Sequence, residues 1–106
     1  MPKYLLEVAY TAQGAKGVLK DGGTKRRAAA QKAIKSLGGK MEVFYFAFGS
    51  ADAIVIAELP DAVSAAAMSL AVSSTGAAGA SVRVLLSAED IDKAARKTTS
   101  YTPPGS

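Results

Sequence analysis

The stretch from Met41 to Pro60, MEVFYFAFGSADAIVIAELP, constrains the fold more than any other part of the chain. Two runs within it, Glu42–Phe48 and Ala53–Leu59, are rich in Val, Ile, Phe and Tyr, the residue types that fit a pleated, half-buried surface. Gly49 begins the short connection between the two runs. The stretch therefore predicts a β-hairpin at the centre of the chain.

The predicted hairpin is apolar on both of its faces. Successive side chains of a strand point to opposite faces. One face of the first strand receives Val43, Tyr45 and Ala47, and the other receives Phe44, Phe46 and Phe48. A chain of 106 residues can cover one such face with its own helices. The second face then needs a second sheet, a ligand or another subunit to shield it from water.

The composition fits one domain and removes several kinds of chemistry. With 106 residues, 49% of them hydrophobic, the chain has the size of one core, so we expect a single domain over 1–97 and an extended tail over 98–106. There is no cysteine and no histidine, which excludes disulfides, thiol nucleophiles, thiolate or imidazole metal ligands and imidazole general bases. We expect no metal site and no cofactor, and no catalytic constellation is evident.

The first residues do not resemble a targeting segment. Glu7 follows too few apolar residues for a signal peptide, and no later apolar run approaches the length of a membrane span. We therefore expect a soluble cytoplasmic protein with no membrane partner.

Positive charge is concentrated in the first forty residues, which hold nine Lys or Arg against two acids, whereas the remaining residues hold four against seven. Such asymmetry raises the question of a nucleic-acid partner. No interleaved aromatic residue or known binding motif accompanies the basic residues of the predicted helix, so a solvated helix face is favoured over nucleic-acid binding. These residues are Lys25, Arg26, Arg27, Lys32 and Lys35.

The order of the predicted elements matches the split βαβ pattern of a ferredoxin-like α+β domain. The pattern predicts Thr24 as the N-cap of the second helical segment, Asp61 as the cap of the helix after the hairpin, and a capping box that starts at Ser87. Two helices would cover one sheet face, and the other face would meet a symmetry mate sheet to sheet. The predicted ranges are strand 3–10, a short glycine-interrupted helical segment 11–21, helix 24–37, the hairpin, helix 62–74, a turn over 76–79, strand 81–87 and a terminal helix to 97.

Motifs spread along nearly the whole chain make it resemble the GYD domain family of small bacterial proteins, which is named for a Gly-Tyr-Asp signature. They are Tyr10-Thr11 with Gln13-Gly14, Arg27, Gly38-Gly39, Phe48-Gly49 with Asp52, Pro60-Asp61, and Tyr101 with Pro103-Pro104-Gly105. The resemblance implies a ferredoxin-like fold that assembles into dimeric α/β barrels or larger homo-oligomers. It implies no activity, because architecture does not transfer function.

The chain departs from the signature at its tyrosine, because Ala51 stands directly before Asp52. Asp52 is the acid of greatest interest, since it lies between a glycine turn and an apolar strand. Its carboxylate either caps backbone N–H groups of the turn, the more common use of Asp, or serves as an anchor or general base at the mouth of a barrel cavity.

Four further residues are candidates for ligand binding. Glu7 and Arg83 lie on strands that are neighbours in this topology, so they form either a structural ion pair or a polar cluster for an anionic or hydroxylated ligand. Tyr10 and Tyr45 belong either to the core or to an apolar pocket.

Two functions from different classes fit these residues. The favoured one is an oligomeric barrel protein that binds a small molecule or has a structural role. The alternative is a cofactor-independent oxygenase or isomerase that acts on a small aromatic or ketone substrate in the barrel cavity, with Asp52, Tyr10 and Arg83 as its residues.

Overall fold

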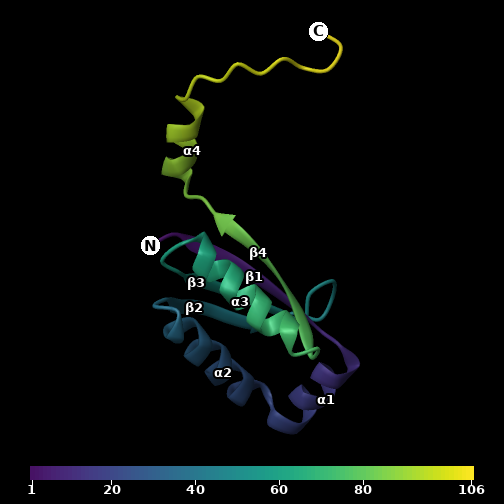
Figure 1. Cartoon of the computed structure of the whole chain (residues 1–106). Helices are drawn as coiled ribbons and strands as arrows, with labels where there is room; N and C mark the ends of the chain where they lie inside the picture. Colours follow the sequence, from purple (N-terminus) through teal and green to yellow (C-terminus); the bar gives the residue numbers. More distant parts are fainter.

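The computed structural model describes residues 1–106, and its strands form one antiparallel sheet in the order β2-β3-β1-β4. Helices α2 and α3 lie on one face of this sheet, and α1 lies at its end (Figure 1). This arrangement confirms the predicted ferredoxin-like α+β fold with a C-terminal helix. The elements are β1 (Lys3–Tyr10), α1 (Ala12–Asp21), α2 (Gly23–Ser36), β2 (Lys40–Phe46), β3 (Ala53–Glu58), α3 (Ala62–Ser74), β4 (Ala78–Leu85) and α4 (Ala88–Ala95).

The core lies between the sheet and the two helices α2 and α3. Leu6 of β1 pairs with Val55 of β3, and both side chains point toward the helices and are buried. Ile34 from α2 and Met68 from α3 pack against this covered face and belong to the same core. Burial of such side chains contributes on the order of 1.5 to 3 kcal/mol each, so this face holds the fold together.

From Val43 onward the central hairpin has the predicted alternation, whereas a β-bulge between Met41 and Val43 shifts the register at the start of β2. Tyr45 points to the open face and is 70% exposed, whereas Phe44 points to the helices and packs edge-on against Phe46, with ring centroids 5.2 Å apart. The predicted extension of this strand to Phe48 is wrong. The connection closes through a bond from the Ala47 N–H to the Asp52 carbonyl, and Phe48 adopts φ 53°, a left-handed conformation that ends the strand.

Several other boundaries differ from the sequence-based prediction by one to three residues, and the starts of α2 and β4 have clear structural reasons. Helix α2 starts at Gly23, with Gly22 at its N-cap and no side-chain cap, so the assignment of Thr24 as N-cap is wrong. Gly22, with φ 79°, turns the chain directly from α1 into α2 and leaves no linker for a capping residue. Strand β4 begins at Ala78, inside the predicted turn, because Ala78 and Gly79 pair with the end of β1.

The predicted caps of the other two helices are confirmed. Asp61 accepts a hydrogen bond from the Ser64 N–H at 2.8 Å, which holds the pKa of this carboxyl below its ordinary value. At α4, the Ser87 hydroxyl accepts from the Asp90 N–H and the Asp90 carboxylate accepts from the Ser87 N–H, which completes the capping box.

Gly14 allows α1 to approach the turn before β4. A Cβ atom at this position would lie 1.9 Å from the Ala77 carbonyl oxygen, whereas a Cβ at Gly17 of the same helix would meet nothing within 4 Å. The two glycines of α1 therefore have different roles, because only Gly14 makes a contact that no other residue permits.

We expect Gly14→Ala to lower the free energy of unfolding by about 1 to 3 kcal/mol, since backbone must move to admit the methyl group. Gly17→Ala is the matched control on the same helix and should raise the free energy of unfolding by about 0.5 to 1 kcal/mol, because alanine is the better helix former. Chemical denaturation measures both changes, and a loss of similar size in both variants would contradict this account of α1.

Candidate functional site

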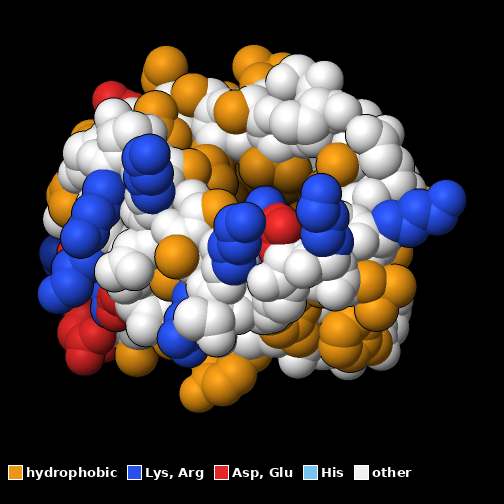
Figure 2. All heavy atoms as spheres, turned by 90° about the horizontal axis from the view of Figure 1, so that it is seen from below, with side chains coloured by type: hydrophobic (Ala, Val, Ile, Leu, Met, Phe, Trp, Pro, Cys, Tyr) orange, Lys and Arg blue, Asp and Glu red, His pale blue; other side chains and the backbone are white.

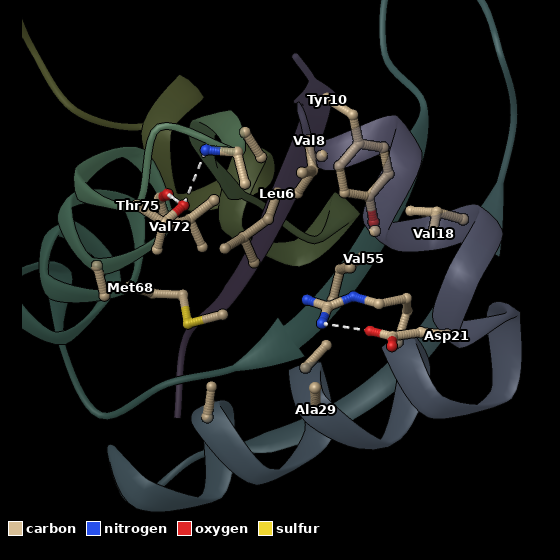
Figure 3. A pocket seen from close by; sticks show the side chains of 18 of the residues that line it. Leu6, Val8, Tyr10, Val18, Asp21, Ala29, Val55, Met68, Val72 and Thr75 are labelled. Carbon is tan, nitrogen blue, oxygen red and sulfur yellow. Dashed lines mark hydrogen bonds and ion pairs between the residues drawn. The ribbon is translucent and has the colours of Figure 1, made fainter. Parts of the chain in front are cut away.

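A cavity of about 510 Å³ lies between the covered face of the sheet and the helices α1, α2 and α3. Of its 21 lining residues, 15 are hydrophobic. Leu6, Val8 and Val55 form its floor on the sheet, and Val72 and Met68 reach it from α3 (Figure 3). A hollow of this size and chemistry has the usual properties of a site for a small organic molecule.

Small residues on the surrounding helices leave this space unfilled. Helix α2 presents three alanines to the cavity, α3 presents Ala71, and α1 presents Gly14 and Gly17. A methyl group or a hydrogen atom cannot reach across to the sheet, whereas leucines at the same positions would fill the gap. The three alanines of α2 are Ala29, Ala30 and Ala33.

Hydrogen bonds fix the end of the cavity where α1 meets the turn between α3 and β4. The Thr11 hydroxyl donates to the Gly76 carbonyl at 2.9 Å, and the Thr11 N–H donates to the Ala77 carbonyl at 2.9 Å. Thr75 donates to the Val72 carbonyl at 2.8 Å and accepts from the Ala77 N–H at 3.1 Å. These bonds join three cavity-lining segments, so the cavity wall is well defined at this end.

Charged side chains gather at the opposite rim. The Asp21 carboxylate lies 3.6 Å from the Arg26 guanidinium and 3.7 Å from the Lys25 ammonium. One carboxylate shared between two cations leaves one positive charge in excess at this rim. Figure 2 shows the hollow with hydrophobic side chains inside it and an acidic side chain between basic ones at its edge.

Tyr10 is the one sequence-predicted site residue that lines the cavity. It is half-buried at the end of β1, and its hydroxyl turns into the cavity toward the side where Asp21 lies (Figure 3). No hydrogen bond occupies this hydroxyl, so it is free to donate to or accept from a bound molecule.

Asp52 lies outside the cavity and has a backbone partner. Its carboxylate accepts a hydrogen bond from the Tyr10 N–H at 2.8 Å, and its own N–H donates to the Val8 carbonyl at 2.8 Å. This contact corresponds to the structural role considered for Asp52, with the donor on β1 and not in the turn. Asp52 therefore ties the hairpin connection to the end of β1 and helps to place the Tyr10 side chain.

The other three predicted residues lie on the open face of the sheet, away from the cavity. Arg83 forms an ion pair with Glu7, diagonally across the β1–β4 ladder, and both line a shallow depression of the surface. Tyr45 lies on the same face, in register with Ile54, which in turn pairs with Glu7. The five candidates therefore do not form one cluster.

Sequence reasoning missed the polar residues that the structure brings to the cavity. Gln13, Asp21 and Arg26 come from the consecutive helices α1 and α2, and Thr75 comes from the distant end of α3. One signal was present in the alanine stripe of the second predicted helix, because a stripe of alanines facing large sheet residues cannot fill the space between them.

Comparison with known proteins identifies one family. The model of the GYD domain matches residues 4–95. No curated protein and no solved structure matches the chain. No helix is both long and apolar enough to cross a membrane.

Proposed function

The chain belongs to the GYD domain family, a membership that assigns no activity, and we propose that it binds a small, mostly apolar molecule in the cavity under α1, α2 and α3. The observation that supports this proposal is the cavity of about 510 Å³, because its volume and its mostly hydrophobic lining are those of sites that hold small organic molecules. The alanines and glycines that line it are residues a tighter core would replace with larger ones.

The charged rim favours a ligand that bears a carboxylate or another anionic group at one end. Arg26 presents a planar fork of donors at the cavity, and the net positive charge around Asp21 attracts an anion. The Tyr10 hydroxyl lies on the cavity wall as a second polar partner. The apolar part of the ligand would then lie against Leu6 and Val55, and its anionic group would point toward α2.

The enzymatic alternative, a cofactor-independent oxygenase or isomerase, has less support from this geometry. Of its three proposed residues, Tyr10 lines the cavity, whereas Asp52 and Arg83 do not. No polar or charged side chain is buried in the core, so no acid or base is held in the dry environment that tunes general acid–base catalysis. Binding without chemistry is therefore the function that the geometry favours.

Filling the cavity should remove binding without harming the fold. We expect Ala30→Phe to lower the affinity for decanoate at least tenfold in isothermal titration calorimetry, because the new ring occupies the space of the ligand. The thermal midpoint should stay equal or rise, since apolar volume fills a void. Ala28→Phe, on the exposed side of the same helix, is the matched control and should bind decanoate as the parent chain does.

The proposed contact between Arg26 and the anionic group of the ligand is tested separately with Arg26→Gln. We expect this variant to bind decanoate about tenfold more weakly and decanol as before, because only the carboxylate loses a charged partner. Undetectable binding of both probes to the parent chain would contradict the binding proposal. Equal losses for the acid and the alcohol would contradict the role of Arg26.

We also propose that the open face of the sheet meets a second copy of the chain. Leu5, Val43, Ile54 and Ile56 form an apolar centre on this face, each only half-buried, although they occupy the middle of the sheet. The ion pair of Lys3 with Glu42, at 3.1 Å, and the pair of Glu7 with Arg83 frame this centre. An apolar centre with a polar rim is the usual anatomy of a protein interface, and a two-fold axis allows such a face to pair with itself.

Tyr45→Glu should disrupt this assembly, because it places a charge on the apolar open face. Native mass spectrometry should report a dimer or larger complex for the parent chain and a monomer for the variant. Tyr101→Glu makes the same change at a tyrosine of similar exposure in the C-terminal tail and should leave assembly unchanged. A monomeric parent chain, or an intact oligomer in Tyr45→Glu, would contradict the proposed interface.

A further inference from the structure

A third apolar surface, in addition to the cavity and the open face, lies in the groove between α3 and the edge strand β4. Helix α3 has no charged side chain, and its only polar side chains are four serines, a composition typical of helices that are enclosed by protein. Its outer side is nevertheless exposed, and Leu70 is 71% exposed. The groove has a floor of small residues and walls of larger ones, with the lining Ala62, Ala65, Ala66, Ser69, Leu70, Tyr4, Val82 and Val84.

Helix α4 is an amphipathic helix without a partner in its own subunit. Ala88, Ile91 and Ala95 follow one another at helical spacing on one side, Asp92 borders that side, and the opposite side carries Glu89, Asp90 and Lys93. No residue of α4 is buried, and Ile91 is 52% exposed. Isolated helices of this length are marginal in water, so α4 needs a surface to pack against.

The geometry of the connection directs α4 away from the groove of its own subunit. Only Leu86 and Ser87 link β4 to α4. Ser87 has extended backbone angles, φ −75° and ψ 166°, and both hydrogen bonds of the capping box hold it there. The chain therefore continues in the direction of β4, and α4 lies beyond the end of the sheet (Figure 1). Helix α4 and the tail that follows it extend the molecule beyond the sheet, and its longest dimension is 55 Å.

We propose that α4 of one subunit packs into the groove between α3 and β4 of a second copy, so that two chains exchange their C-terminal helices. The dimensions agree, because α4 is about 12 Å long and α3 is about 20 Å long at 1.5 Å per residue. Ile91 is the one large apolar side chain of α4, and the floor of alanines gives it a hole between Leu70 and Val84. The charged side of α4 would remain in solvent, and α3 offers no charge to oppose it.

Disulfide trapping tests this contact directly, because the chain has no cysteine of its own. The full chain is prepared as two single variants, Leu70→Cys and Ile91→Cys, with tags of different length. The variants are mixed, equilibrated, oxidised and separated on a non-reducing gel. We expect a mixed covalent dimer of one long and one short chain. The matched control pairs Leu70→Cys with Lys93→Cys, on the charged side of α4, and should give at most a tenth of that product.

Two outcomes would overturn the exchange of helices. The absence of a mixed dimer would do so, and so would a double variant, Leu70→Cys with Ile91→Cys, that oxidises within single chains. The proposal builds on the assembly of copies described above, and native mass spectrometry of the same samples keeps the two claims separate. A non-covalent dimer that forms no cross-link contradicts the helix exchange alone, whereas a monomer contradicts both.

Discussion

Two alanine-rich helices pack on one face of the sheet, and this packing determines both the core and the cavity. Helix α2 is anchored by Ile34 and by Gly39 just after it, where a Cβ atom would lie 2.4 Å from the Glu58 carbonyl oxygen. Helix α3 is anchored by Ala65 and Met68. Between these anchors the helices present mainly methyl groups to large sheet residues, so the centre of the covered face is held open and not filled.

Because the helices carry small side chains, three apolar surfaces remain that one subunit does not cover. The cavity is the more enclosed hollow and suits a ligand, the open sheet face is a broad surface that suits a second sheet, and the groove beside α3 is more open and suits a helix. A chain of 106 residues can bury only a limited share of its apolar surface. In this account a second copy covers the two outer surfaces, and a small molecule fills the inner one.

The alternation and cap signals of the sequence were sufficient to predict the sheet and the ends of two helices. Neighbouring residues alone determine that Phe44 and Tyr45 point to opposite faces of the sheet. They also determine the helix caps at Asp61 and Ser87. The N-cap at Thr24 was wrong because the positive φ of Gly22 joined two helices without a linker. Rules based on neighbouring residues do not predict that two helices will join directly in this way.

The candidate site was less predictable, because its residues meet only in three dimensions. Asp21 and Arg26 are close in sequence, but the sheet face opposite them determines that they stand at the rim of a cavity. Asp52 and Arg83 were selected because they lie on or next to strands. A position on a strand does not reveal which face of the sheet borders the cavity. Tyr10 was found because it combines a strand end with a polar tip.

Native mass spectrometry of the full chain, purified gently and without added ligand, measures directly whether the cavity holds a small molecule. We expect a reproducible extra mass of one small organic molecule per subunit, which is lost on denaturation and is identified as an apolar acid after chemical extraction. A bare subunit mass in repeated preparations, together with no uptake from a panel of apolar acids, would contradict the account of this cavity as a binding site.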